Sequence, residues 1–168
     1  GYSFEGLSIQ YSVESTQLGT GGALNLALSK LHTDYLIVMN GDSYLDIDLN
    51  LFFKWFIKGK YLAGLCMVKK EDTSRYGRLV LASEDRVENI LEKDNDQIPG
   101  YINAGVYLFQ KNVLCQIPSG IEYSLERSLL PSLIKQGLYG YNCDASFIDI
   151  GTPKSYMEAD DFFKKVIE

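Results

Sequence analysis

The stretch Leu36-Ile37-Val38-Met39-Asn40-Gly41-Asp42-Ser43, "LIVMNGDS", places an apolar run directly before an Asn-Gly-Asp turn. A short continuous apolar run, residues 35–39, is typical of a strand that is buried on both faces of a helix-covered sheet. The turn then exposes the Asp42 carboxylate at the carboxyl end of this strand, where open α/β sheets bind their ligands. The stretch therefore predicts a fold class and a first candidate site residue.

Strand and helix patterns alternate around this stretch. Residues 7–13 ("LSIQYSV") alternate like a strand and lead through the glycine-rich loop "LGTGG" into a predicted helix. Residues 49–59 have helical spacing with a glycine at the end, and residues 61–68 ("YLAGLCMV") indicate a second buried strand. The repeated order predicts an α/β fold with a Rossmann-like, mostly parallel sheet flanked by helices.

The pattern changes in the second half of the chain. Residues 69–109 contain short strand patterns and polar turns without a clear helix, which predicts an antiparallel insertion or lid over the sheet. A helical pattern at residues 125–134 precedes a predicted strand pair, residues 138–142 and 146–150. Thr152 and Pro153 then suit the start of a last helix. Without a linker or a repeat, residues 1–168 are predicted to form one domain.

Composition excludes several classes of protein. The chain has 168 residues, 46% of them hydrophobic, and its 16 basic against 22 acidic side chains give a net charge of −6. This charge argues against a nucleic-acid or anionic-membrane partner, and no apolar run approaches the ~20 residues that span a bilayer. The three cysteines and the single histidine have neither zinc-site nor disulfide-framework spacing. We expect a cytoplasmic protein with reduced thiols.

Asp42 and Asp149 are the main candidates for a metal site. Asp149, in "FIDIGTP", lies near the end of another predicted strand. Two carboxylates brought together repel each other unless a cation lies between them, and Mg²⁺ typically takes one or two carboxylates together with substrate phosphates. The pair therefore indicates a magnesium ion that holds a nucleotide. The alternative is that Asp42 forms an Asx turn and Asp149 caps the last helix.

Three weaker signals accompany the two aspartates. The backbone of "LGTGG", at a helix N-terminus, suits a phosphate or a nucleobase edge, although any tight turn uses glycine. Lys93, beside Glu92, is able to neutralise a substrate phosphate, although such pairs are often solvated surface. The glycines in "RYGRLV" and "INAGVY" allow a ligand to approach a strand closely, or mark a bulge.

Taken in order, these segments carry a family resemblance. The set is "YSVESTQLGTGGAL", "VMNGDSYLDID", "RYGRLVL", "LEKD", "INAGVYLF", "YSLE" and "FIDIGTPKSY". It resembles the sugar-1-phosphate nucleotidyltransferases, and "LGTGGA" with "NGD…DID" is most similar to their guanylyltransferase branch, which favours GTP and mannose or manno-heptose 1-phosphate. The resemblance implies the nucleotide-diphospho-sugar transferase fold and the synthesis of a nucleotide-sugar and pyrophosphate for lipopolysaccharide or capsule.

The resemblance also implies roles for individual residues. Gly19, Gly21 and Gly22 are expected to lie against the base and ribose, and Asp42 and Asp149 are expected to hold Mg²⁺. Gly77, Glu92, Lys93 and Asn103 are expected to contact the sugar phosphate. Asp42, Asp149 and Lys93 would be the catalytic residues. No nucleophilic side chain is needed, because alignment and charge neutralisation suffice for this phosphoryl chemistry.

One part of the family pattern has no counterpart in this sequence. The family opens with a G-x-G-T-R loop and a following Pro-Lys that bind the triphosphate, and no segment here matches them. We therefore expect the chain to lack the triphosphate-binding part, to be inactive alone, and to form a homo-oligomer through an exposed sheet edge.

Two alternatives remain at the level of sequence. The first is a GT-A type glycosyltransferase with a metal site at Asp46-Ile47-Asp48. The second is a non-catalytic module that binds a nucleotide-sugar.

Overall fold

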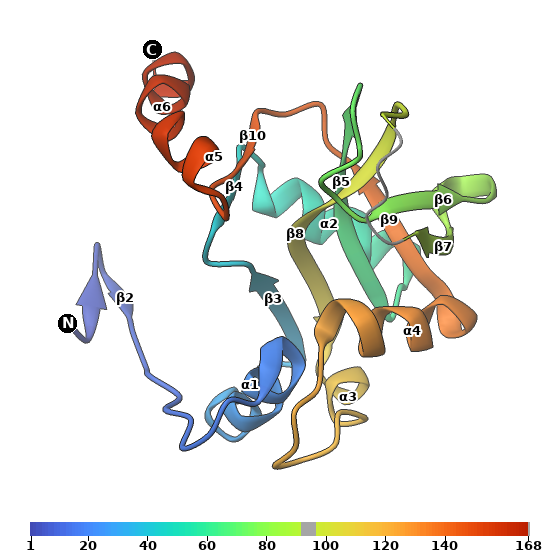
Figure 1. Cartoon of the computed structure of the whole chain (residues 1–168). Helices are drawn as coiled ribbons and strands as arrows, with labels where there is room; N and C mark the ends of the chain where they lie inside the picture. The colour runs from blue at the N-terminus through green and yellow to red at the C-terminus, as the bar shows by residue number, and fades with distance from the viewer. Residues whose placement is uncertain (92–96, 168) are drawn as a thin grey trace.

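A computed structural model describes residues 1–91 and 97–167, and a mixed sheet lies at its centre (Figure 1). The sheet has the order β7 (Val87–Leu91), β6 (Arg78–Leu81), β8 (Gly100–Gln110), β5 (Ala63–Lys70) and β9 (Leu138–Asn142), and β3 (Tyr35–Met39) also pairs with β8. Helices pack on this sheet, so the predicted α/β class is confirmed.

The direction of β8 makes the sheet mixed. It runs antiparallel to β3 and to β5, whereas β5 and β9 are parallel neighbours. The strands β3, β5 and β9 thus point the same way, as expected for a parallel core. Because β8 lies between β3 and β5 in the opposite direction, the hydrogen bonds on both of its sides are antiparallel.

Two apolar clusters occupy the two faces of the sheet. Alternate residues of β5 divide between them: Leu65 and Met67 belong to the first cluster, and Cys66 and Val68 to the second. The first cluster contains side chains of α4 (Leu130–Gly137) and is extended by α1 (Gly19–Ala27), and the second contains Phe52 and Phe56 of α2 (Leu49–Gly59). Burial of both faces explains why β5 is apolar from Ala63 to Val68, before the strand ends in Lys69 and Lys70.

The strand β3 differs from the prediction. Leu36 is buried, but Tyr35, Ile37 and Met39 on the opposite face are 39%, 41% and 51% exposed. Within the described residues β3 pairs with β8 alone. The prediction that this run is buried on both faces is therefore wrong for this chain, because an apolar sequence alone does not reveal which neighbours cover it.

The predicted antiparallel insertion is confirmed and joins the central sheet. The strands β6 and β7 form a hairpin through the 3₁₀ turn Ser83–Asp85, and β6 pairs with residues 101–102 of β8. Leu79 and Val87 of this hairpin belong to the same apolar cluster as α4. The hairpin therefore extends the sheet and also contributes to its core.

Several predicted boundaries are wrong. In place of a strand at residues 7–13, the structure has a short hairpin of β1 (Ser3–Phe4) and β2 (Leu7–Ser8), which lies apart from the central sheet (Figure 1). The strands predicted to pair with each other, residues 138–142 and 146–150, have different partners. Instead, β9 pairs with β5, and β10 (Phe147–Asp149) pairs antiparallel with β4 (Ser43–Leu45).

The helix ends follow known local rules. Asp48 caps α2 by accepting hydrogen bonds from the N–H groups of Asn50 and Leu51. At the other end, Gly59 is the last helical residue, and Lys60 after it adopts the left-handed conformation, with φ +53°, that a glycine more often takes. Thr152 caps α5 (Pro153–Met157) as predicted, and α6 (Ala159–Ile167) follows. The short helices η1 (Leu28–Lys30) and α3 (Lys111–Leu114) complete the set for the described residues.

The helix predicted at residues 125–134 is present with an irregular start. Its first turn, η3 (Leu125–Leu129), is π-helical and continues into α4. Pro131 has no backbone N–H, so the usual bond to the carbonyl four residues earlier is missing at this place. Nowhere in residues 1–91 and 97–167 does a helix have the length and apolar character needed to cross a membrane.

Candidate functional site

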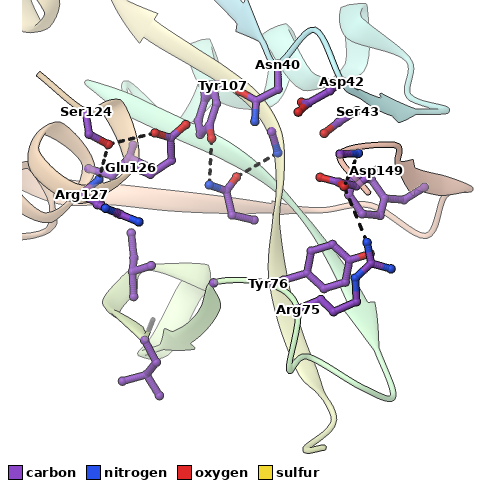
Figure 2. Close-up of a pocket in the computed structure, with 18 of the residues that line it drawn as sticks. Asn40, Asp42, Ser43, Arg75, Tyr76, Tyr107, Ser124, Glu126, Arg127 and Asp149 are labelled. Atoms are coloured by element: carbon purple, nitrogen blue, oxygen red, sulfur yellow. Dashed lines mark hydrogen bonds and ion pairs between the residues drawn. The ribbon is translucent and has the colours of Figure 1, made fainter. Parts of the chain in front are cut away.

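A pocket opens where β8 changes its strand partner. One edge of β8 pairs with β6 through residues 101–102 and with β3 through residues 106–110. Residues 103–105 lie between these two ladders, and Asn103 and Gly105 line a pocket of about 600 Å³ (Figure 2). This volume is within the range of small-molecule sites.

The bulge in β8 requires a glycine. Gly105 has φ +73°, its N–H donates to Asn103 Oδ1 at 3.1 Å, and its carbonyl accepts from the Asn40 N–H at 2.8 Å. A Cβ atom on Gly105 would lie 2.9 Å from Asn40 Nδ2. The bulge reading of "INAGVY" is thus correct, and the bulge also brings the side chains of Asn40 and Asn103 to the pocket.

Asp42 and Asp149 lie together at one end of the pocket. Asp149 is opposite Ser43 in the β4–β10 ladder, and the Ile150 N–H donates to the Asp42 carbonyl at 2.8 Å. A Cβ atom on Gly151 would lie 3.2 Å from Asp149 Oδ1 and 3.5 Å from Asp42 Oδ2. Both carboxylates therefore lie near one point, which glycine at position 151 leaves free.

The purely structural alternatives explain this pair only in part. Asp149 Oδ1 accepts from the Gly151 N–H at 3.0 Å, but Thr152, not Asp149, caps the helix α5 that follows. Within the part of the chain that the structure describes, the Asp42 carboxylate accepts no hydrogen bond. An Asx turn therefore does not account for Asp42.

The donor set fits a magnesium ion that also binds substrate. No third His, Cys, Asp or Glu side chain joins Asp42 and Asp149 in a metal-binding group among the described residues. Mg²⁺ is commonly bound by one or two protein carboxylates, and substrate phosphates and water fill its remaining coordination positions. The assignment of Mg²⁺ to these two residues stays a prediction.

Arg75 adds a positive charge at the same end. Its Nη2 atom lies 4.0 Å from Asp149 Oδ1 and donates to Thr152 Oγ1 at 3.4 Å (Figure 2). Its guanidinium carbon also lies 5.6 Å from the centre of the Tyr76 ring. Sequence reasoning drew attention to "RYGRLV" for its glycine and missed both side chains, since only the fold brings them to β10.

A second group of polar side chains lines the opposite end. Ser124, Glu126 and Arg127 come from the start of the π-helical turn, and Glu126 Oε2 accepts from Ser124 Oγ at 3.2 Å. Ile90, Leu91 and Leu130 add apolar side chains to the lining, and β7, which carries Ile90 and Leu91, lies beside α4, which begins at Leu130. These polar residues were missed as individual site residues, although the segment "YSLE" contributed to the resemblance.

Tyr107 lies between the two ends and is fully buried. Burial, followed by the nearby charge of Glu126, raises the pKa of its phenol well above the usual value, although Asn103 Nδ2 donates to the phenol oxygen at 2.9 Å. Burial thus favours the protonated, neutral phenol, whose oxygen accepts from Asn103.

The glycine-rich segment uses two of its backbone N–H groups inside the fold. The helix α1 begins at Gly19 itself, and the N–H groups of Gly21 and Gly22 donate to the Tyr123 carbonyl at 2.8 and 3.1 Å. A Cβ atom on Gly21 would lie 2.9 Å from Tyr123 Cδ1. The expectation that these N–H groups are free for a ligand is wrong, and the implied contact of Gly19, Gly21 and Gly22 with a base stays a prediction.

The other predicted residues divide into two groups. Gly77 and Asn103 line the pocket, whereas Glu92 and Lys93 lie outside the described residues. Neither Asp46 nor Asp48 lines this pocket, and Asp48 caps α2. The geometry therefore gives no support to an Asp-x-Asp site of the GT-A type.

Fold and site together define an α/β protein with paired carboxylates at strand ends in a small-molecule pocket. The model of the nucleotidyl transferase family matches residues 1–166, so the chain belongs to this family. This finding confirms the resemblance drawn from the sequence motifs.

Named relatives agree with this family. The chain is 38% identical to a mannose-1-phosphate guanylyltransferase of Mycobacterium tuberculosis, covering 90% of this chain and 43% of that protein. It is 35% identical to a D-glycero-alpha-D-manno-heptose 1-phosphate guanylyltransferase of Aneurinibacillus thermoaerophilus, covering 95% and 69%. A UTP–glucose-1-phosphate uridylyltransferase of Synechocystis is 31% identical, covering 94% and 43%.

A solved structure shares the fold. HddC from Yersinia pseudotuberculosis, crystallised with GMP-PN, superposes with a TM-score of 0.79 at 32% identity, covering 89% of this chain and 64% of that chain. The chain thus spans between about two fifths and two thirds of the length of these proteins.

Proposed function

We propose that this protein takes part in nucleotidyl transfer from a nucleoside triphosphate, with GTP favoured, to a sugar 1-phosphate, with mannose or manno-heptose 1-phosphate favoured. The observation that carries the proposal is the convergence of Asp42 and Asp149 at one end of a pocket whose other end is lined by Ser124, Glu126 and Arg127. Membership of the nucleotidyl transferase family supports the same reaction.

In this reaction an oxygen of the sugar 1-phosphate attacks the α-phosphorus of the triphosphate. The bond from the α-phosphorus to the bridging oxygen breaks, and pyrophosphate leaves with the bonding electrons. The products are a nucleotide-sugar and pyrophosphate, and no covalent intermediate with the protein forms. Rate acceleration then comes mainly from alignment and from neutralising the phosphate charges.

The acidic end of the pocket suits the phosphates. Asp42 and Asp149 would hold Mg²⁺, and the bound ion would supply positive charge to the phosphate oxygens. Arg75, beside Asp149, lies close enough to add a guanidinium to that charge. We also assign Lys93 and Glu92 to the sugar phosphate on the basis of the family pattern.

The opposite end of the pocket suits a sugar. Ser124 and Glu126 present hydroxyl and carboxylate groups there, and Asn103, at the bulge of β8, adds an amide; all three are able to hydrogen-bond with sugar hydroxyls. The apolar side chains of Ile90 and Leu91 line the same end and are able to contact a sugar ring. The sugar 1-phosphate would therefore lie along the pocket with its phosphate toward Asp42 and Asp149.

The preference for GTP rests on relatives. Two of the three named relatives are guanylyltransferases, and the similar solved structure was crystallised with GMP-PN. The uridylyltransferase relative shows that the family accepts other bases. We place the reaction in the cytoplasm and in the supply of surface-polysaccharide precursors.

Pyrophosphate release tests the proposal. The natural protein that contains this chain is mixed with MgCl₂, a nucleoside triphosphate and a panel of sugar 1-phosphates, with EDTA as the control. We expect pyrophosphate and a nucleotide-sugar from GTP with mannose or manno-heptose 1-phosphate. The 168-residue chain alone should turn over slowly, because no segment of it matches the triphosphate loop of the family.

Other outcomes identify the alternatives. Binding of a nucleotide-sugar without pyrophosphate formation from any substrate pair would indicate the non-catalytic module. Breakdown of a nucleotide-sugar without use of a sugar 1-phosphate would indicate a glycosyltransferase. Either result would overturn the proposed function.

A further inference from the structure

Thr20 connects the start of α1 to the pocket. Its hydroxyl accepts a hydrogen bond from the Leu125 N–H at 2.9 Å and donates one to Glu126 Oε2 at 2.9 Å. Glu126 lines the pocket, whereas Thr20 does not. Two residues far apart in sequence are thus joined by one hydroxyl group.

The direction of these hydrogen bonds is fixed by the backbone. A threonine hydroxyl has one proton to donate. Because Leu125 N–H points at the Thr20 oxygen, the hydroxyl must act as acceptor there, and its proton is available to the Glu126 carboxylate. Ser124 Oγ approaches the same Glu126 oxygen at 3.2 Å. One oxygen of the carboxylate therefore accepts hydrogen bonds from two hydroxyl groups.

We propose that Thr20 is a positioning residue that fixes the Glu126 carboxylate at the sugar end of the pocket. The assignment of that end to the sugar rests on the proposed function, whereas the effect of Thr20 on Glu126 does not. A glutamate side chain has several rotatable bonds, and holding it in one orientation before the substrate arrives lowers the cost of binding. Thr20 therefore contributes to sugar binding without touching the sugar.

The hydroxyl is not needed to dock α1. The N–H groups of Gly21 and Gly22 both donate to the Tyr123 carbonyl, and the Tyr123 N–H donates to the Leu18 carbonyl at 2.8 Å. These backbone bonds join the same two segments without the Thr20 side chain. Replacement of Thr20 by valine, which has nearly the same shape, leaves the Leu125 N–H without this acceptor but keeps these backbone bonds, so the fold should remain intact.

Steady-state kinetics of four single variants and one double variant test the proposal on the natural protein that contains this chain. Thr20→Val removes the hydroxyl and Thr20→Ser keeps it. Glu126→Gln replaces the carboxylate that accepts the hydroxyl proton by a weaker, uncharged acceptor. Thr16→Val is the matched control, because Thr16 is also exposed and its hydroxyl makes no hydrogen bond within the residues that the structure describes. The KM values for the sugar 1-phosphate and for the triphosphate are measured separately.

Thr20→Val should raise the KM for the sugar 1-phosphate about tenfold, as expected for one hydrogen bond to a charged group, and change the KM for the triphosphate less than about twofold. Thr20→Ser and Thr16→Val should behave like the unmodified protein. In the Glu126→Gln background, Thr20→Val should have little further effect, because both changes act on the same contact. An effect confined to the KM of the triphosphate, or full additivity of the two changes, would overturn the proposal.

Crystal structures of Thr20→Val and Thr20→Ser decide the matter independently of activity. We expect the Glu126 side chain to take another orientation in Thr20→Val and to keep its orientation in Thr20→Ser. An unchanged Glu126 in Thr20→Val would overturn the proposal even if the protein is an active nucleotidyltransferase. Failure of the unmodified protein to release pyrophosphate would instead contradict the proposed function, while the two crystal structures would still show whether Thr20 positions Glu126.

Discussion

The Nη2 atom of Arg75 lies 4.0 Å from Oδ1 of Asp149, which places a guanidinium beside the two carboxylates of the pocket. The side chains are 45% and 29% exposed, so this ion pair adds little to the stability of the fold. Its importance lies in the local charge: Arg75 offsets part of the negative potential that would attract a divalent cation, and it is able to interact with a phosphate.

Removal of Arg75 should strengthen the binding of a divalent cation in the absence of nucleotide. We expect Arg75→Gln to bind Mn²⁺ about two- to fivefold more tightly, because repulsion between the guanidinium and the ion is lost. Calorimetry at low ionic strength measures this affinity. Arg86→Gln, which changes an exposed arginine outside the pocket, is the control and should bind as the unmodified protein does. Weaker binding by Arg75→Gln would contradict the placement of a cation at Asp42 and Asp149.

Replacement of Asp42 by asparagine should affect catalysis and spare stability. Asp42 is exposed and accepts no hydrogen bond within the described residues, so its charge contributes little to folding. In the natural protein, Asp42→Asn should lower the rate of pyrophosphate formation by about 10²–10³. The melting temperature should stay within about 2 °C. Asp46→Asn, exposed and outside the pocket, serves as control. A large fall in melting temperature would instead identify Asp42 as a turn former.

Asp48 should show the opposite behaviour. Its Oδ1 atom accepts from the N–H groups of Asn50 and Leu51 at 2.8 and 3.1 Å, so Asp48→Ala leaves the start of α2 without its cap. We expect the free energy of unfolding to fall by about 1 kcal/mol in chemical denaturation, with pyrophosphate formation unchanged. Asp48→Asn should retain most of the stability. Loss of activity at normal stability would revive the Asp-x-Asp interpretation.

The buried phenol of Tyr107 should make stability depend on pH in alkaline solution. Its pKa is raised above the usual value of 10.0, first by burial and then by the charge of Glu126. In the unfolded chain the phenol ionises near pH 10, while in the folded protein it keeps its proton. Its contribution is therefore fully present below pH 10 and is lost as pH rises toward the folded-state pKa, by up to about 1.4 kcal/mol per pH unit.

Urea unfolding between about pH 8 and pH 11 measures this dependence. Tyr107→Phe should show a shallower fall in the free energy of unfolding above pH 10, because the ionisable phenol at position 107 is gone. Tyr156→Phe is the control, since Tyr156 is 67% exposed. Equal slopes in all three proteins would show that Tyr107 is accessible to solvent before the chain unfolds.

Elements defined by their own sequence were predicted well. The helix Leu49–Gly59 has the predicted bounds, and the strand predicted at residues 61–68 is present as Ala63–Lys70, with Ala63 to Val68 buried between the two apolar clusters. The pair Asp42 and Asp149 was also predictable, since each follows or ends an apolar run and strand ends gather at a pocket. Local pattern was sufficient in these places.

Features that depend on distant segments were not predictable in the same way. Arg75 belongs to a polar turn, and only the β4–β10 ladder brings Asp149 to it. The glycines of α1 signal close approach, but sequence does not reveal that the approaching group is the Tyr123 carbonyl rather than a ligand. The same limit applies to β3, whose exposed face depends on which neighbours it has.

The choice of base provides the last prediction. A ligand that binds only the folded protein raises its stability by mass action, by about 2.7 kcal/mol at a concentration of one hundred times the dissociation constant. In the presence of Mg²⁺, GTP and a GDP-sugar should therefore raise the melting temperature of the natural protein more than UTP or dTTP at the same concentration. GTP and UTP share the ribose, the triphosphate and the metal, so a difference between these two reports contacts with the base, whereas dTTP also lacks the ribose 2′-hydroxyl. Asp149→Asn should reduce the protection by every triphosphate but preserve their order, because it alters the proposed metal site and not the base contact. Equal protection by GTP, UTP and dTTP would remove the guanylyl preference, and stronger protection by UTP would place this protein with the uridylyltransferase relative instead.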